Sequence, residues 1–312
     1  MTEGQKYHVS EQIKQKARSV GFDLCGIARA RALSEVEPAL RKWCKSGMND
    51  TMDYLNMEIE KRVDPRIYFP GAKSVIVTGL NYYSENGQKG VEVPLISRYA
   101  YGKDYHEVIK AKLELLSEYI QTLDPLAEGK IIVDSAPLLE KRWAIEAGLG
   151  WQGRHSIIIN RNIGSYFFIG ILMLDIDLAY DEPFSDDFCG DCRFCIDLCP
   201  TSAINFDHTI DARRCISNLT IENRAPVSEE FVPLLGGRVY ACDKCQEVCP
   251  WNKFAHQHNH PEFDISTELA EMTKDEWASI TKERFKKLFK GTPIGRVKFE
   301  RFKSNLKAIF KN

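Results

Sequence analysis

The sequence predicts an α+β protein, close to the α/β class, in which a central sheet is followed by a ferredoxin-like unit and a basic helical tail. Three observations lead to this fold class. Segments with helical apolar spacing alternate with short β-branched runs over the first ~180 residues. Eight of the ten cysteines lie between Cys189 and Cys249. Residues 282–312 contain eleven Lys or Arg and two acids, although the whole chain has a net charge of −2.

The first part of the chain supplies alternating helices and strands. Residues 10–21 are amphipathic, with Ser10 as the expected N-cap and Gly21 as the stop. Residues 72–80 form a continuous apolar run that predicts a buried strand, and residues 105–123 have the apolar spacing of a helix. A short strand at 130–133 precedes an expected helix at 137–148, which has proline in its first turn and glycine at its end.

Two more strands are expected at 156–159 and 165–174, joined by a turn at 160–164. The acidic stretch 181–188 then marks a boundary. We therefore predict three units, which are residues 1–180, the cysteine-rich residues 181–255 and the basic tail 256–312. No apolar run reaches the length of a membrane span, and the first residues show no export signal. These features predict a cytoplasmic protein without membrane contact.

The cysteines form two linked motifs. The first, C-x2-C-x2-C-x3-C-P, starts at Cys189 and has the spacing of a bacterial ferredoxin half-motif. The second, C-x2-C-x3-C-P, starts at Cys242 and has Val239 where another cysteine would stand, so Cys215 is the expected eighth ligand. In a two-cluster ferredoxin the last cysteine of each motif binds the other cluster. We expect one [4Fe–4S] cluster on Cys189, Cys192, Cys195 and Cys249, and a second on Cys199, Cys215, Cys242 and Cys245.

Structural zinc is the alternative interpretation of these cysteines, but the two spacings together exceed what a zinc ribbon requires. Outside the motifs, Cys25 and Cys44 are expected to be small buried apolar residues. The histidine-rich segment 256–260 is expected to be a loop rather than a metal site. Trp251 and Asn252 are expected to pack over a cluster and shield it from water.

Asp134 is the candidate for chemistry upstream of the cysteines. It follows an apolar run, at the position where α/β folds place reactive groups, and burial there would favour an acid that donates a proton near neutral pH. Asp134 as the N-cap of the following helix is the other interpretation, and both stay open at this point. No G-x-G-x-x-G follows a strand and no P-loop motif occurs, so nicotinamide and P-loop chemistry lack support.

Several segments together resemble one family, the epoxyqueuosine reductases. These segments are EKRVDPR, ISRYAYGKDYHEVIKAKL, VDSAPLLEKRWAIEAGLGWQGRHS, CGDCRFCIDLCPTSAI, RRCISNLT and YACDKCQEVCPWN, and the resemblance runs in order from about residue 10 to residue 300. It implies reductive removal of the epoxide oxygen from epoxyqueuosine at the wobble position of tRNA. It also implies a nitroreductase-related domain with a base-off cobalamin, which the two clusters reduce.

The resemblance also assigns roles to residues. The proton donor of the family falls on Asp134, which favours catalysis over capping. Cobalamin contacts are implied for Arg62, Ser97, Asp134, Ile158, Ile169, Ser217, Asp243 and Lys244. Substrate or tRNA contacts are implied for His106, Lys141, Asn223, Arg224, Arg296 and Lys298. Ser97 departs from a cysteine in the family, and Ser is a poor soft ligand. Lys141 stands where arginine is common, which would weaken a bidentate contact.

The implied partners are a tRNA with epoxyqueuosine in its anticodon loop and an external electron donor such as flavodoxin or ferredoxin. The basic tail is expected to contact tRNA phosphates, and the protein is expected to be a monomer. Two alternatives keep the cofactor motifs but change the function. One is a cobalamin and iron–sulfur reductase of the reductive dehalogenase type, and the other is a non-catalytic ferredoxin-like electron carrier.

Overall fold

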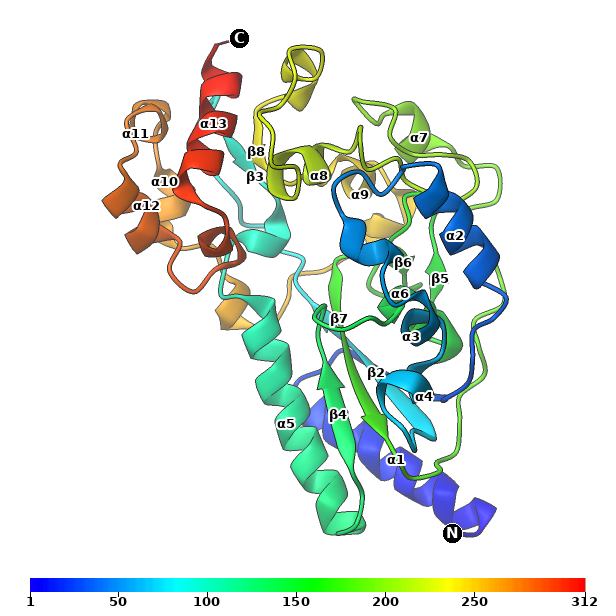
Figure 1. The fold of residues 1–312 in the computed structure, drawn as a ribbon. Coiled ribbons are helices and arrows are strands. Elements are labelled where there is room, and N and C mark those ends of the chain that lie inside the picture. Colours follow the sequence, from blue (N-terminus) through cyan, green and yellow to red (C-terminus); the bar gives the residue numbers. More distant parts are fainter. Residues whose placement is uncertain (312) are drawn as a thin grey trace.

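The centre of the protein is a four-stranded antiparallel sheet in the order β1–β2–β7–β4. A computed structural model describes residues 1–311 of the chain (Figure 1). The strands are β1 (Leu24–Arg29), β2 (Ser74–Asn81), β4 (Gly129–Ile132) and β7 (Phe167–Leu174), and each pairs antiparallel with its neighbour. The predicted α+β class is confirmed. The strands of the main sheet are all antiparallel.

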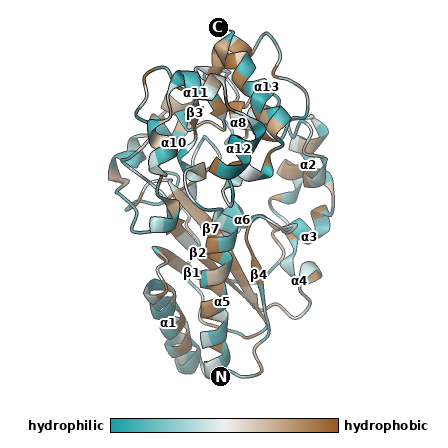
Figure 2. Cartoon of the chain, turned by 90° about the vertical axis from the view of Figure 1, so that its left-hand side faces the viewer, coloured by the Kyte–Doolittle hydropathy of each residue, from teal (hydrophilic) through white to brown (hydrophobic). Residues whose placement is uncertain are grey.

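Helices cover both faces of this sheet, because the apolar side chains of each strand alternate between two cores. On one face, α1 (Glu3–Ser19) and α5 (Tyr105–Leu123) pack on Ile76 and Leu172. Figure 2 shows α1 and α5 beside one another over the apolar strands. On the other face, Val77 and Ile171 meet Trp143 of α6 (Glu140–Glu146).

Short elements connect and extend this layer. They are α2 (Glu37–Lys45), α3 (Ile59–Val63), α4 (Pro65–Tyr68), β3 (Leu95–Ile96), β5 (Trp151–Gln152), β6 (Ile158–Ile159), α7 (Phe194–Asp197), α8 (Ile216–Ile221), β8 (Arg238–Tyr240) and α9 (Lys244–Glu247). The tail adds α10 (Thr267–Glu271), α11 (Lys274–Ala278), α12 (Lys282–Leu288) and α13 (Phe299–Phe310). Among the described residues, no helix is long and apolar enough to cross a bilayer.

A third core joins the tail to the cysteine-rich unit and to residues 93–101. Trp277, Phe289 and Phe302 of the tail are fully buried against Val239 of β8. Strand β8 pairs in parallel with β3, so this core ties three distant segments together (Figure 1). Val239 is thus a core residue in a strand, which explains why no cysteine is needed there. The limits of the three predicted units stay predictions.

Two predicted helix starts are wrong. Helix α1 begins at Glu3 because Thr2 forms a capping box with Gln5, so Ser10 lies inside the helix, where its Oγ donates to the Ala179 carbonyl at 3.1 Å. Helix α6 begins at Glu140, so Pro137 lies in a preceding segment rather than in the first turn. The start of α1 thus follows a local capping box at Thr2, and the start of α6 lies three residues beyond Pro137.

The predicted strand pair at 156–159 and 165–174 is only partly correct. Strand β7 lies in the main sheet, whereas β6 is reduced to Ile158–Ile159 and pairs with β5. At the expected turn, the structure forms a single antiparallel bridge between Asn160 and Gly164. The predicted strands at 72–80 and 130–133 correspond to β2 and β4, and the helix at 105–123 is α5.

Candidate functional site

Four of the predicted cluster ligands line one cavity. Cys189, Cys192, Cys195 and Cys249 meet in a cavity of about 310 Å³. Burial and, to a smaller extent, the three neighbouring sulfurs raise the pKa of the Cys195 thiol to about 11. Thiolates are the ligands of a metal centre, and the positive charge of that centre displaces the thiol protons on binding. The donor chemistry therefore fits an iron–sulfur cluster at this cavity.

Part of the wall of this cavity is aromatic, with Phe188, Trp251 and Phe254 among its lining residues. The Trp251 ring lies 4.9 Å from Trp151 and 6.0 Å from Phe188, between ring centroids, and its Nε1 donates to the Phe188 carbonyl at 3.2 Å. Asn252 has a different role, because its Oδ1 accepts from the Ser165 N–H at 2.7 Å and its Nδ2 donates to the Gln246 carbonyl at 2.7 Å. Asn252 thus joins the cysteine unit to the segment that leads into β7.

The second set of cysteines is more enclosed. Burial raises the pKa of Cys242 to about 11 and that of Cys245 far above its usual value, with Cys215 adding to both effects. Backbone amides also reach this set, since Ala203 N–H donates to Cys199 Sγ at 3.3 Å and Lys244 N–H lies 3.5 Å from Cys242 Sγ. Such amides stabilise negative charge on cluster sulfurs.

All ten cysteines are free thiols, which leaves the two predicted sets available. Within residues 1–311, no three His, Cys, Asp or Glu side chains converge closely enough to hold a single metal ion. The four sulfurs of the first set line the cavity described above. Cys44 is buried in α2 and Cys25 is half-buried in β1, away from both sets.

Asp134 lies just beyond the end of β4 with an unusual backbone. Its φ is +54°, a left-handed conformation that costs a non-glycine residue about 1–3 kcal/mol. The Tyr105 hydroxyl donates to Asp134 Oδ2 at 2.6 Å, and the carboxyl group is otherwise exposed. Asp134 does not cap α6, since the N-cap position is Leu139 and has no side-chain cap. The capping interpretation is therefore wrong.

Glu140 and Lys141 complete the surroundings of Asp134. Glu140 Oε1 accepts from the Asp134 N–H at 2.7 Å, and burial together with the charge of Asp134 raises the pKa of Glu140 to about 8. Lys141 Nζ donates to the Ser156 carbonyl at 2.9 Å. Burial lowers the pKa of Lys141, against the effect of Asp134 and of Cys215 and Cys245. Lys141 therefore lies near both the candidate acid and the second cysteine set.

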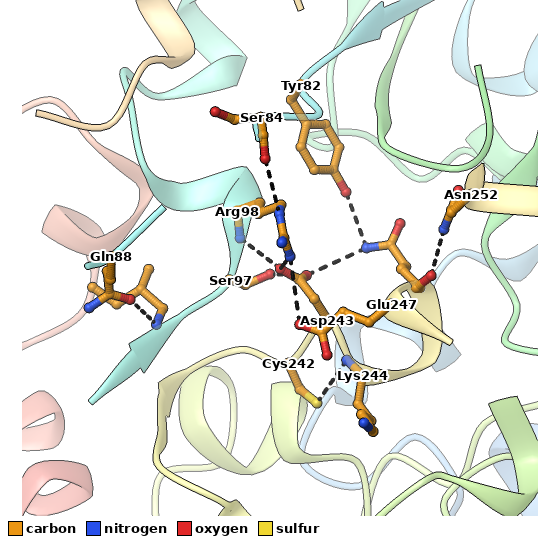
Figure 3. A network of polar contacts seen from close by, with 12 residues as sticks. Tyr82, Ser84, Gln88, Ser97, Arg98, Cys242, Asp243, Lys244, Glu247 and Asn252 are labelled. Carbon is orange, nitrogen blue, oxygen red and sulfur yellow. Dashed lines mark hydrogen bonds and ion pairs between the residues drawn. The ribbon is translucent and has the colours of Figure 1, made fainter. Parts of the chain in front are cut away.

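Ser97 and Asp243 are bound to each other, as Figure 3 shows. The Ser97 hydroxyl donates to Asp243 Oδ1, and the Arg98 N–H donates to Oδ2 at 2.8 Å. Burial raises the pKa of Asp243, although these hydrogen bonds oppose the effect. Because Asp243 follows the ligand Cys242, this contact fixes the second cysteine set against the segment after β3. Lys244, the next residue, is half-buried at the start of α9.

The remaining predicted cobalamin residues lie in several elements. Arg62 is buried in α3 and donates to the carbonyls of Tyr54 at 2.7 Å and Met57 at 3.2 Å. Ile158 is buried in β6, Ile169 is half-buried in β7, and Ser217 is half-buried in α8. Burial, Glu222 and Asp134 raise the pKa of Tyr54, so the loop that Arg62 holds also faces Asp134. The cobalamin roles of these residues stay predictions.

A basic pocket adjoins Asp134 through a short chain of contacts. Lys282, Lys286, Arg296 and Lys298 line this cavity of about 410 Å³. Arg296 Nε lies 3.0 Å from Asp104 Oδ2, and His106 Nδ1 lies 2.6 Å from Asp104 Oδ1. The His106 ring stacks on Tyr105, whose hydroxyl reaches Asp134. The predicted residues His106 and Arg296 are thus brought together, beside the acid.

The other predicted substrate residues are placed differently. Asn223 Nδ2 donates to Asp50 Oδ2 at 3.0 Å, so its amide is already engaged within the protein, and Arg224 is exposed. In the histidine-rich segment, His260 Nε2 lies 3.2 Å from Asp23 Oδ2. The sequence reasoning missed Tyr105 and Glu140. Neither residue stands out in a sequence motif, because each reaches Asp134 from another element, Tyr105 from α5 and Glu140 from α6.

Two family models match separate segments of this chain. The family model described as "Epoxyqueuosine reductase QueG, DUF1730" matches residues 62–135, and the "4Fe-4S double cluster binding domain" matches residues 188–252. A curated epoxyqueuosine reductase from Leadbetterella byssophila is 46% identical, covering 95% of this chain and 97% of that protein. The one from Escherichia coli K12 is 38% identical and covers 97% and 81%, respectively.

Solved structures agree with these relatives. A crystal structure of epoxyqueuosine reductase with an epoxyqueuosine-modified tRNA-Tyr stem loop has a TM-score of 0.90 at 29% identity, covering 98% of this chain and 81% of that one. A structure of epoxyqueuosine reductase from Bacillus subtilis, with its aspartate catalytic loop swung out of the active site, also has a TM-score of 0.90, at 28% identity, covering 98% and 82%.

Proposed function

Because the chain belongs to the epoxyqueuosine reductase family, we propose that it reduces epoxyqueuosine in tRNA to queuosine, with Asp134 as the proton donor. The observation that carries this proposal is the placement of an exposed carboxyl group, held by Tyr105, beside both the second cysteine set and a basic pocket. An acid, a source of electrons and a surface for phosphates are what this reaction requires.

The reaction removes the epoxide oxygen as water and leaves a carbon–carbon double bond, which consumes two electrons and two protons. Asp134 gives a proton to the oxygen as the first carbon–oxygen bond opens, and solvent restores the proton on Asp134. A second proton, which also comes from solvent, is taken up as the second carbon–oxygen bond breaks and the oxygen leaves as water. Tyr105 orients the carboxyl group through its hydroxyl. The raised pKa of Tyr105, caused by burial and then by Asp134, keeps that hydroxyl protonated as a donor.

The eight cysteines of the two sets hold two [4Fe–4S] clusters. We propose that cobalamin binds between the second set and Asp134, where Lys141 lies close to both. When bound, clusters and cobalamin supply electrons at low potential to the substrate. The protein holds this region together through the Ser97–Asp243 contact and through Arg62, which fixes the loop that faces Asp134.

We propose that electrons come from an external donor such as flavodoxin or ferredoxin, which docks at the first cysteine cavity. Phe254 lines that cavity and is 42% exposed, and Phe194, next to Cys195, is 55% exposed. Exposed aromatic residues around a redox centre provide a contact surface for a transient partner. We also propose that the chain works as a monomer in the cytoplasm, where its tRNA substrate is found.

The tRNA is proposed to contact the basic pocket with the phosphates next to the modified nucleotide. Lys286 and Lys298 make no ion pair within residues 1–311, so both ammonium groups are available for phosphates. The chain of contacts from Arg296 through His106 and Tyr105 to Asp134 places this pocket next to the acid. Following the Bacillus subtilis relative, we propose that the Asp134 segment can also leave the site.

The test uses anaerobically purified protein loaded with iron–sulfur clusters and cobalamin, and a tRNA stem loop that contains epoxyqueuosine. We expect queuosine as the product, measured by mass spectrometry of the nucleosides. The Asp134→Asn protein should keep its cofactor absorbance and lose about 100-fold or more in turnover. Asp124→Asn is the matched control, because Asp124 follows the end of α5 that is farthest from Tyr105. Corrin-free protein that leaves the epoxide intact would instead support an electron carrier.

A further inference from the structure

The segment that carries Asp134 needs a device to hold it in place. Residues 133–139 connect β4 to α6, and Asp134 near the start of this segment has a φ of +54°. A left-handed conformation persists in a non-glycine residue only when neighbouring groups fix it. The carboxyl group of Asp134 is exposed, so packing of that side chain does not supply the constraint.

Glu140 supplies the contact that the backbone of this segment requires. Its Oε1 accepts from the Asp134 N–H at 2.7 Å. Glu140 is the first residue of α6, and α6 is anchored by Trp143, which is fully buried in the core. The contact therefore ties the start of the 133–139 segment to the first residue of α6. On the other side, the Tyr105 hydroxyl lies 2.6 Å from Asp134 Oδ2.

We propose that Glu140 is a positioning residue for the reaction, which holds the backbone of Asp134 so that the acid faces the substrate. This inference rests on the proposed function, in which Asp134 gives the proton. Glu140 does not touch the substrate; it acts through the amide of Asp134. When the bond between Glu140 and that amide breaks, the segment is free to carry Asp134 away from Tyr105.

The groups that face Glu140 give this role a dependence on pH. They are Asp134, Tyr105 and Lys141, and Tyr54 also lies near Asp134. Burial and the charge of Asp134 raise the pKa of Glu140 from 4.5 to about 8, so near pH 7 Glu140 is neutral and accepts through its carbonyl oxygen. A raised carboxyl pKa in the closed segment means that the closed position loses stability as pH rises from 4.5 to about 8.

The test compares Glu140→Gln with Glu140→Ala in the loaded protein. Gln keeps an acceptor of the same shape, whereas Ala removes it. We expect Glu140→Ala to lower kcat about 10- to 100-fold with KM for the stem loop within about twofold, and Glu140→Gln to stay within about threefold of the wild type. The Gln protein should also lose the decline in kcat that the wild type shows as pH rises from 4.5 to about 8. Glu114→Ala, exposed on α5, is the control.

Hydrogen exchange of the amides in residues 133–139 tests the same contact without activity. We expect faster exchange at Asp134 in the Ala protein and unchanged exchange in the Gln protein. Wild-type kcat in the Ala protein, or a Gln protein as slow as the Ala protein, would overturn the positioning role. A wild-type protein inactive on epoxyqueuosine would overturn the proposed function instead, while the exchange result would still decide whether Glu140 holds the segment.

Discussion

Replacing Tyr105 with Phe removes one hydroxyl and leaves the rest of the site in place. The Tyr105 ring stacks on Phe168, with centroids 4.3 Å apart and planes at 5°, and on His106 at 4.1 Å. Phe can make the same stacking contacts, so we expect no change in folding or cofactor content. The lost interaction is the 2.6 Å hydrogen bond to Asp134 Oδ2.

The size of the effect follows from the exposure of Asp134. A hydrogen bond to a charged group contributes about 1.5–3 kcal/mol, and water can partly replace the hydroxyl at an exposed carboxyl group. We therefore take the lower limit, about 1.5 kcal/mol, which corresponds to about a tenfold lower rate. Asp134 remains present, so the loss should be smaller than that of Asp134→Asn.

The assay is a single-turnover reaction with prereduced enzyme in excess over an epoxyqueuosine stem loop, quenched at intervals and analysed for queuosine. Tyr7→Phe, exposed on α1, serves as the control and should react at the wild-type rate. A Tyr105→Phe rate within twofold of the wild type would show that the hydroxyl does not orient the acid. A loss of cluster or corrin absorbance would show that Tyr105 has a structural role, and would also refute the reasoning.

Three further predictions concern the clusters, the basic pocket and the tail. Cys215→Ala should retain about half of the wild-type iron, whereas Cys44→Ala should retain all of it; a full iron content in Cys215→Ala would remove that residue from the ligand set. Lys286→Glu combined with Lys298→Glu should raise KM for the stem loop about tenfold and flatten its salt dependence, and an unchanged KM would place the phosphates elsewhere. Trp277→Ala should lower the free energy of unfolding by about 3–5 kcal/mol in denaturant titration, because Trp277 is fully buried; a change below about 1 kcal/mol would contradict its place in the third core.

Local patterns predicted the elements whose formation depends on neighbours along the chain. The apolar spacing of residues 105–123 gave the bounds of α5 correctly, and the continuous run at 72–80 marked the central strand β2. Local signals failed where a distant partner decided the outcome. Ser10 resembles an N-cap, but its hydroxyl binds the Ala179 carbonyl. Pro137 resembles a helix start, but the Asp134 segment extends past it.

The sequence by itself determined the cysteine-rich double-cluster unit, and it predicted eight ligands and a candidate acid, because ligand spacing and ligand chemistry are local properties of the chain. Only the tertiary structure decided how the acid is held. Tyr105 comes from α5, Asp134 follows β4, and Glu140 begins α6, so their contacts depend on how two helices pack beside one strand. No spacing in the sequence encodes a hydrogen bond between side chains that converge only after the sheet and its helices have packed.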